Sequence, residues 1–457
     1  MRPPLLAWEV TGGIDSAALF EAIAEAHDDV FWLDSGPDAA VGRSVLGWSA
    51  DRYVSTEPNA SDFAALRERL RRVPRAEDVS DTALHVPGLP LGWVGWLGYE
   101  LRAVTMGEPQ RHALRHPPLA LLWVDRAVVV DHESGRVSLV AIGHGWDAEL
   151  VQWRAEMLEH IEASRSNTRA VPQVLTNSSA RSLVQWRHSD AEYLDLIEQC
   201  RAAIRAGDAY LLCLTNEATV DGHFDAVARY LALRQASPAH HGGFVRIGGV
   251  SLLSASPEQF LLVTADGSVE THPIKGTRRR GATALEDERL HRELRDSEKE
   301  RAENLMIVDL MRNDLQRVCR IGSVEVPRLL AIESYAQVHQ LVSRVRGRLA
   351  EGLDAIDVVM ACLPGGSMTG APKLSATRIL DRLEDGPRGI YSGAFGYLGA
   401  DGSADLAMVI RSIVIDAAGA TVGAGGGITA LSDAAAELEE VKIKAAPLLA
   451  SLGVARH

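Results

Sequence analysis

Apolar residues recur every three to four positions in several parts of the chain, which predicts amphipathic helices. Residues 14–28 are an example, with Ile14, Ala17, Phe20 and Ile23 apolar and acidic residues between them. The same kind of pattern predicts further helices at 61–72, 146–164, 189–206, 285–315, 354–362, 371–384 and 433–452. Each of these helices is expected to bury one stripe against a core and to expose the other.

Short apolar runs that end at glycine, aspartate or serine predict strands. Residues 30–36 close in a turn, and residues 45–49 are expected to form the hairpin partner. Residues 91–99 alternate glycine with large apolar residues, which indicates a strand under close packing. Further strands are expected at 119–130, 136–142, 209–220, 243–249, 251–254, 259–264, 393–399, 405–416 and 420–424.

The order of these elements predicts an α+β fold. Neighbouring strands often follow each other as hairpins, with too few helices between them for a doubly wound parallel sheet. Antiparallel sheets with helices packed outside are therefore expected. The polar, poorly patterned stretch 166–182 is the best linker candidate. It divides the chain into an N-terminal region, 1–165, and a second region, 183–457.

Composition narrows the class of protein. A chain of 457 residues with 46% apolar content can bury a large core. Its net charge of −14 disfavours a nucleic-acid partner, which needs a basic face. The four cysteines show no CxxC pair or zinc-finger spacing, which is typical of free thiols in a reducing compartment. With no apolar run near 18 residues and no signal-peptide pattern, we expect a cytoplasmic protein without a membrane partner.

One short stretch, residues 271–281, combines features of a reactive lysine. Pro273 fixes its own φ, and Gly276 permits a close approach of the backbone to a ligand. Lys275 lies between them, where a strand is expected to open into a loop. Desolvation or neighbouring cations can lower the pKa of such a lysine and make it a nucleophile. Taken alone, a solvated basic loop is the more common explanation.

Two helices each carry a pair of carboxylates three residues apart. Glu300 and Glu303 share one face of the first helix, and Glu437 and Glu440 repeat the spacing in the last. Four carboxylates from two helices favour a hard divalent cation, most simply Mg²⁺. The alternative for each helix is an ordinary solvated charged surface.

Glycine-rich turns precede two of the helices. Residues 423–427 lead into the last helix, where backbone N–H groups can approach an anion. Residues 365–373 form a second such loop, but it lacks the Gly-Lys-Ser/Thr ending of a phosphate-binding loop. Arg411 lies in an apolar run and needs an anionic partner if it points inward. Tyr391 comes just before a strand, and a lone histidine such as His339 is more often structural.

Taken together, these stretches resemble the chorismate-utilising enzymes. The motifs that carry the resemblance are Ser256-Pro257-Glu258-x-Phe260, Pro273-Ile274-Lys275-Gly276-Thr277, the Glu300 helix ending in Asp309 to Asp314, Ser334-Tyr335 through His339, Thr369-Gly370-Ala371-Pro372-Lys373, Tyr391-Ser392-Gly393, and Gly425-Gly426-Gly427-Ile428 through Lys444. They occur in the family's order and spacing over about 190–447. Two N-terminal segments, Leu33-Asp34-Ser35 and Gly95 to Tyr99, are also similar to the family.

The resemblance implies a fold and a set of site residues. The fold would be two large antiparallel sheets in a sandwich with helices outside, in which the N-terminal region is intertwined with the catalytic region. The roles that the resemblance implies are these: Glu300, Glu303, Glu437 and Glu440 hold Mg²⁺; Gly425, Gly426 and Gly427 help to bind the ring carboxylate of chorismate; Tyr391 and Arg411 hold the enolpyruvyl carboxylate; Thr369, His339 and Lys444 line the pocket; and Leu33, Asp34 and Ser35 form a possible tryptophan pocket.

The resemblance implies that Lys275 selects among the reactions of the family. A lysine at this position is typical of the aminodeoxychorismate synthases, whereas anthranilate synthases usually carry alanine there. The resemblance implies that the Lys275 amine attacks ring C2, that Glu258 acts as the general acid for the C4 hydroxyl, and that ammonia then enters at C4. The product would be 4-amino-4-deoxychorismate, on the route to p-aminobenzoate and folate.

Two departures argue against the hydrolytic members of the family. Where isochorismate and salicylate synthases carry a lysine that activates water, this chain has Leu211, and His272 replaces their glutamate before Pro273. Leu211 also differs from the polar residue common in amino-transferring members. No cysteine lies in a Gly-x-Cys-x-Gly elbow, so ammonia is expected from a separate glutamine amidotransferase subunit or from solution. Anthranilate synthase component I, and a non-catalytic partner that binds chorismate or tryptophan, are the alternatives.

Overall fold

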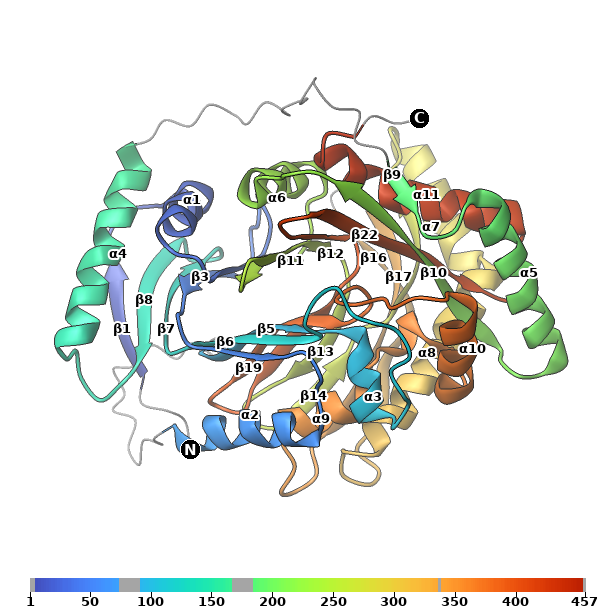
Figure 1. Cartoon of the computed structure of the whole chain (residues 1–457), viewed down its shortest axis with the longest axis horizontal. Coiled ribbons are helices and arrows are strands. Elements are labelled where there is room, and N and C mark those ends of the chain that lie inside the picture. The colour runs from blue at the N-terminus through green and yellow to red at the C-terminus, as the bar shows by residue number, and fades with distance from the viewer. Residues whose placement is uncertain (1–4, 74–90, 167–183, 336–337, 455–457) are drawn as a thin grey trace.

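Two large antiparallel sheets form the centre of the computed structural model (Figure 1), which describes residues 5–73, 91–166, 184–335 and 338–454. The strands of the 12-stranded sheet are β1 (Leu5–Val10), β2 (Val30–Asp34), β3 (Arg43–Trp48), β7 (Arg126–Asp131), β8 (Arg136–Ile142), β9 (Val184–Trp186), β10 (Leu211–Asp221), β11 (His241–Ile247), β12 (Val250–Ser256), β18 (Gly370–Ala371), β21 (Ser412–Ile415) and β22 (Gly419–Ile428). The strands of the 10-stranded sheet are β4 (Arg52–Ser55), β5 (Gly92–Leu97), β6 (Leu119–Val124), β13 (Gln259–Val263), β14 (Ser268–Thr271), β15 (Ile274–Arg279), β16 (Glu325–Ser334), β17 (Val338–Arg348), β19 (Ala394–Gly399) and β20 (Ala404–Met408).

Helices cover the outer faces of both sheets (Figure 1). They are α1 (Ser16–Ala26), α2 (Ala60–Arg72), α3 (Arg102–Thr105), α4 (Ala148–Ser166), α5 (Asp190–Ala206), α6 (Ala226–Ala236), α7 (Ala284–Asp296), α8 (Glu298–Gln316), α9 (Ala355–Cys362), α10 (Lys373–Leu383) and α11 (Ala434–Ser451), with short 3-10 turns at Tyr99–Leu101 and Gly366–Met368. The predicted α+β sandwich with outer helices is therefore confirmed. In the described part of the chain, no helix combines the length and the apolar character needed to cross a bilayer.

Side chains that alternate between the two faces of each strand form the apolar layers of the molecule. In β2, Val30 and Trp32 pack under the helices of the 12-stranded sheet, whereas Phe31 enters the core between the sheets. In β6, Leu119 and Leu121 point to the other helical layer. Side chains on successive strand residues point to opposite faces, so each strand serves two cores.

Both sheets combine strands from before and after residues 167–183. β2 pairs with β11, with Phe31 opposite Val245, and β5 pairs with β19, with Gly95 opposite Gly396. The segment predicted as a linker, 166–182, lies outside the described residues except for Ser166, which ends α4. The division of the chain into regions stays a prediction.

Some predicted elements differ from those observed. The single helix expected at 285–315 is two helices, α7 and α8, separated at Ser297. The strand expected at 405–416 is β20 and β21, which belong to different sheets. The strand expected at 119–130 likewise divides into β6 and β7. An apolar run shows that a strand is buried but not which sheet it joins.

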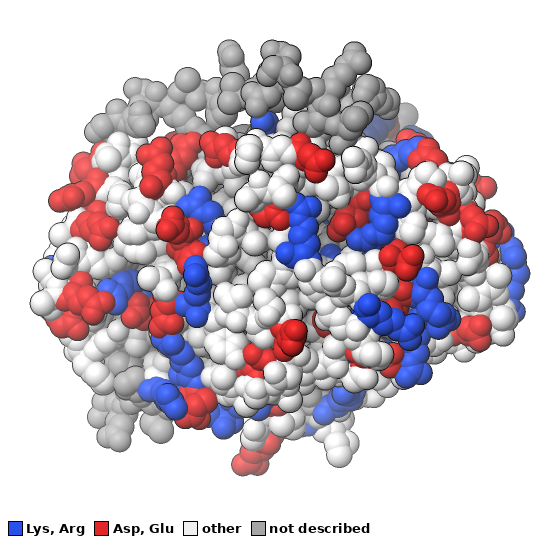
Figure 2. All heavy atoms as spheres, in the orientation of Figure 1, with Lys and Arg blue, Asp and Glu red and all other residues white. Residues whose placement is uncertain are grey.

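The surface mixes both signs of charge. Figure 2 shows acidic and basic side chains interspersed on one face, separated by uncharged side chains. On this face the acidic side chains therefore do not form one continuous patch.

Candidate active site

A cavity of about 410 Å³ lies where β15, β22, α8 and α11 meet. The predicted site residues among its lining are Glu258, Lys275, Glu300, Glu303, Tyr391, Arg411, Gly425, Gly426, Gly427, Glu440 and Lys444. Segments from many parts of the sequence thus supply one cavity, whose lining includes many polar and charged side chains.

The break between α7 and α8 sets the position of the first carboxylate pair. Ser297 has extended backbone angles, and its side chain accepts a hydrogen bond from the Glu300 N–H as the N-cap of α8. Glu300 therefore lies in the first turn of α8, where the helix dipole favours negative charge. Its Oε1 accepts a hydrogen bond from Arg278 Nη1 at 2.9 Å.

Glu300 Oε2 is buried, and no described residue forms a hydrogen bond with it. Gly276 is needed beside it, because a Cβ at this position would lie 1.6 Å from Oε2. The φ of Gly276 is +81°, which a side chain would also strain. A buried carboxylate oxygen without a partner is a natural ligand for a cation.

Lys299 connects the two helices that carry the carboxylates. Its Nζ lies 2.7 Å from Glu437 Oε1 on α11 and 3.9 Å from Glu303 Oε1 on α8. Burial raises the pKa of Glu303, Lys275 and Lys299 lower it, and Glu437 raises it further. The carboxylates of Glu303 and Glu437 therefore require nearby positive charge, and Lys299 supplies part of it.

Glu440, the second carboxylate of α11, is connected through Lys444 to the glycine-rich strand β22. Glu440 lies 2.6 Å from Lys444, and Lys444 Nζ donates a hydrogen bond to the Gly425 carbonyl at 2.7 Å. Glu437 is not part of the cavity lining, although its carboxylate lies close to Gly426. The donor set is entirely oxygen and carries several negative charges, which fits Mg²⁺.

The glycine run of β22 borders the cavity because one neighbouring strand ends early. β21 pairs with β22 only as far as Ile413 opposite Val422, whereas β10 accompanies it to Ile428. Beyond Val422, one edge of β22 is free of β21 and lines the cavity. Backbone groups without side chains can then approach an anion closely.

Lys275 lies inside strand β15 rather than at the opening of a loop, so the expected position was wrong. The pKa of Lys275 is raised, also against the expectation. Burial lowers it, but the electrostatic interactions with Glu303, Cys213, Glu258 and Glu440 together outweigh burial. The charge balance of the cavity could not be judged from the residues next to Lys275 in sequence.

Glu258 is buried in the same cavity. Burial raises its pKa to about 7, while the charge of Lys275 and a hydrogen bond with Ser367 act in the opposite direction. At neutral pH the carboxyl is therefore close to half protonated. This state suits a group that must both accept and donate a proton.

Arg411 and Tyr391 close one side of the cavity. Arg411 was expected to lie in a strand. It lies instead between β20 and β21, with a φ of +51°. Its guanidinium forms no hydrogen bond or ion pair with a described residue, although its backbone carbonyl accepts a hydrogen bond from the Ala255 N–H at 3.1 Å. Burial lowers the pKa of this guanidinium. The Tyr391 ring lies against Gly423, where a Cβ would approach Cγ to 2.2 Å. An unpaired guanidinium in a cavity fits an anionic ligand.

Two predicted pocket residues are absent from the cavity lining. His339 is buried between Ser334 Oγ, 2.7 Å from Nδ1, and Asp287 Oδ1, 3.0 Å from Nε2. Thr369 is fully buried and donates to the Gly365 carbonyl at 3.2 Å. In this structure both side chains support neighbouring segments, and their predicted roles at the substrate stay predictions.

Leu33, Asp34 and Ser35 line a second cavity of about 660 Å³. The Asp34 carboxylate already accepts hydrogen bonds from Arg234 Nε at 2.6 Å and Tyr230 at 3.1 Å. The Ser35 hydroxyl donates to a backbone carbonyl. Tryptophan binding stays a prediction, and these polar groups have other partners.

The sequence reasoning missed several cavity residues. The cavity residues not predicted as site residues include Lys299, Arg278, Ser367, Gln340 and Cys213. Only for Lys299 was there a signal, because it lies one helical turn before Glu303. Leu211 is buried beside Gly427, with its Cδ1 3.0 Å from where a Cβ would lie.

Known proteins are similar to this chain in sequence and in fold. The family described as chorismate binding enzyme matches residues 28–450. An aminodeoxychorismate synthase of Streptomyces pristinaespiralis is 41% identical over 459 residues, which cover 96% of this chain and 64% of the relative. The chain thus spans less than two thirds of that relative's length.

Anthranilate synthases are also similar. Component 1 of Streptomyces coelicolor is 36% identical over 96% of this chain and 86% of its own. The solved structure of component I from Streptococcus pneumoniae matches with a TM-score of 0.76 and 26% identity, over 90% of this chain and 93% of that one. The profile match over most of the sequence, with relatives above 30% identity, shows that this chain belongs to the family of chorismate binding enzymes.

Proposed function

We propose that the protein replaces the C4 hydroxyl of chorismate with ammonia and so forms 4-amino-4-deoxychorismate. The observation that carries this proposal is the amine of Lys275 in a cavity that it shares with Glu258 and Glu303. The similarity to proteins named aminodeoxychorismate synthase supports the same reaction.

A proton exchange between two residues prepares the reaction. The raised pKa of Lys275 means that it rests as an ammonium, whereas Glu258 titrates at about 7. Transfer of one proton from Lys275 to Glu258 produces a neutral amine and a carboxylic acid together. The amine is then a nucleophile, and the acid can protonate a leaving group.

In the first half-reaction, Lys275 Nζ forms a bond to ring C2, the ring electrons shift, and the C4–O bond breaks. Glu258 donates its proton, so the hydroxyl leaves as water. In the second half, ammonia forms a bond to C4, the electrons shift back, and the C2–N bond to Lys275 breaks. The new amine returns one proton to the Glu258 carboxylate. The balance is chorismate and ammonia to aminodeoxychorismate and water.

Mg²⁺ is the proposed cofactor. Its ligands would be Glu300, Glu303, Glu437 and Glu440, directly or through water, with the orphan oxygen of Glu300 as the structural observation in favour. When bound, the ion would draw electrons toward the ring carboxylate.

The remaining residues of the cavity orient the substrate. Arg411 and Tyr391 would hold the enolpyruvyl carboxylate, because the guanidinium of Arg411 lies in the cavity and forms no ion pair with a described residue. The backbone at Gly425 to Gly427 and the amine of Lys444 would hold the ring carboxylate.

The test is a product assay. The protein is incubated with chorismate, Mg²⁺ and an ammonium salt, followed by the lyase that converts aminodeoxychorismate to p-aminobenzoate. Formation of p-aminobenzoate is expected. Anthranilate alone as the product would overturn the proposal.

Replacement of Lys275 gives the sharper result. Lys275→Ala is expected to reduce p-aminobenzoate formation at least about a hundredfold, because the nucleophile is lost. The matched control is Lys442→Ala, since Lys442 lies on α11 outside the cavity lining and pairs with Asp190. Unchanged product formation by Lys275→Ala would remove Lys275 from the mechanism.

A second candidate is anthranilate synthesis by the same cavity. The relative from Streptomyces coelicolor, which covers 96% of this chain, is named for that reaction. The product assay separates the two candidates directly.

We further propose that ammonia comes from a glutamine amidotransferase and that the product serves p-aminobenzoate and folate synthesis. The support is the family resemblance of the Lys275 stretch. Co-purification with an amidotransferase, and glutamine-dependent turnover in its presence, would test the partner.

A further inference from the structure

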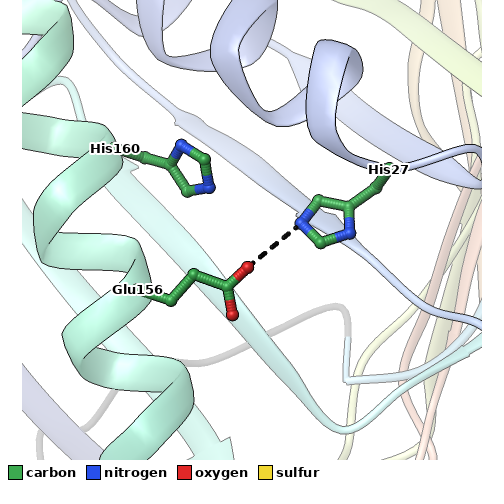
Figure 3. Close-up of side chains that lie close together, drawn as sticks. All are labelled: His27, Glu156 and His160. Carbon is green, nitrogen blue, oxygen red and sulfur yellow. Dashed lines mark ion pairs between the residues drawn. The ribbon is translucent and has the colours of Figure 1, made fainter.

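Three metal-ligating side chains converge far from the candidate active site. His27 caps the C-terminus of α1, and Glu156 and His160 lie one turn apart on α4. Figure 3 shows that the two rings and the carboxylate surround a common space between the helices. One ligand atom of each lies within 4.8 Å of the others.

The distance between two of these atoms matches shared coordination. His27 Nε2 is 3.4 Å from Glu156 Oε1, which exceeds the roughly 3.2 Å limit of an N–H···O hydrogen bond. Two ligands held about 2.0–2.1 Å from a tetrahedral Zn²⁺ are themselves about 3.3 Å apart. Movement of the His160 ring toward the other two side chains would complete three corners of the tetrahedron.

The surroundings hold the His27 ring in place. It stacks on Trp48 with the ring centroids 4.0 Å apart and an interplanar angle of 10°. His160 meets the same indole edge-on at 6.3 Å. His27 Nε2 is buried without a hydrogen-bond partner among the described residues, although it is directed at a carboxylate.

The cluster is separate from the oxygen-rich cavity. α1 and α4 cover the N-terminal end of the 12-stranded sheet, whereas α8 and α11 lie at the opposite side of the molecule (Figure 1). All three side chains are partly exposed, so an ion can reach them from solvent. Nothing in the proposed reaction uses them.

We propose that His27, Glu156 and His160 bind a divalent transition-metal ion, most favourably Zn²⁺, and so join α1 to α4. Two imidazoles and one carboxylate are ligands that Zn²⁺ prefers, whereas the carboxylates of the active-site cavity suit Mg²⁺. Water would take the fourth position. The ion would link segments that are far apart in sequence and so stabilise the N-terminal layer.

Untagged protein stripped of metal by a chelator tests the site. Zn²⁺ is titrated by calorimetry, and Co²⁺ by visible absorption, in excess Mg²⁺ that occupies the oxygen site. One equivalent of Zn²⁺, the absorption bands of tetrahedral Co²⁺ and a raised Tm are expected. His160→Gln should weaken Zn²⁺ binding at least about a hundredfold and abolish the rise in Tm.

Two variants make the result specific. His144→Gln removes an exposed histidine outside the cluster and should retain both effects. Glu156→Gln changes packing little and should lose them, even if His160→Gln fails to fold. The proposal is overturned if wild type binds no Zn²⁺ below about 100 μM, or if Glu156→Gln and His160→Gln both retain the bound equivalent.

Discussion

Lys275 and Glu258 influence each other's proton affinity within one cavity. The charge of Lys275 lowers the pKa of Glu258, and Glu258 raises that of Lys275. Burial opposes the ionised form of both residues, and in Glu258 it outweighs the opposing interactions, so the pKa reaches about 7. Burial in the cavity and the neighbouring charges together therefore bring the pKa of Glu258 close to neutral pH.

The pKa of Glu258 predicts how turnover depends on pH. Glu258 must be ionised to accept the proton of Lys275, so kcat should rise as pH rises through about 7. Glu258→Gln should reduce kcat by about 10²–10⁴-fold and remove this limb from the residual activity. A pH series of p-aminobenzoate formation checks it.

The same variant has a stability signature. The folded-state pKa of Glu258 lies above the unfolded value, so the stability it contributes is present at low pH and is lost as pH rises through about 7. Glu258→Gln should therefore gain Tm relative to wild type only on the alkaline side. An equal difference at pH 5 and pH 8 would contradict the assigned burial.

Spacing in the sequence was sufficient to find the carboxylates but not their counterions. Glu300 and Glu303 share a helix face because three residues nearly complete a turn. Lys299 lies between Glu303 and Glu437, and this position depends on how α8 packs against α11. For the same reason the sequence did not show that carboxylates would raise the pKa of Lys275.

At the scale of elements, a single serine divides a helix and positions a metal ligand. The pattern over 285–315 is continuous, so it predicted one helix. Ser297 ends α7 and caps α8, because its hydroxyl competes for backbone N–H groups. Periodicity does not register such a change in direction.

Ser297→Ala tests the importance of this break. Loss of the cap should lower the free energy of unfolding by about 1 kcal/mol. It should also weaken Mg²⁺ binding, because Glu300 follows the cap in the first turn of α8. Thermal unfolding and calorimetric Mg²⁺ titration measure the two effects.

Ser189→Ala is the matched control, since Ser189 caps α5 away from the cavity. It should lower stability by a similar amount and leave Mg²⁺ affinity unchanged. Equal Mg²⁺ affinity in both variants would mean that the cap does not position Glu300.

At the scale of the whole molecule, the two sheets depend on both parts of the chain. The pairs β2–β11 and β5–β19 join strands from before and after residues 167–183 in the interior of each sheet. Neither part can complete a sheet without exposing an edge and an apolar face. We expect one cooperative unfolding transition for the full chain.

Separate fragments test this dependence. Residues 1–166 and 184–457, produced alone, should lack a cooperative thermal transition and the near-ultraviolet circular dichroism of the full chain. Coexpression should restore both signals. A cooperative transition of 184–457 alone would show that this region folds independently.

The sequence by itself determined the class of fold, most helices and hairpins, and the identity of the chemical groups, because these depend on local periodicity and residue type. Tertiary structure alone decided which strands share a sheet and that Arg411 lies between β20 and β21. It also decided that His339 lies outside the cavity lining and that His27 meets Glu156. These outcomes depend on contacts between residues distant in the chain, which no local pattern encodes.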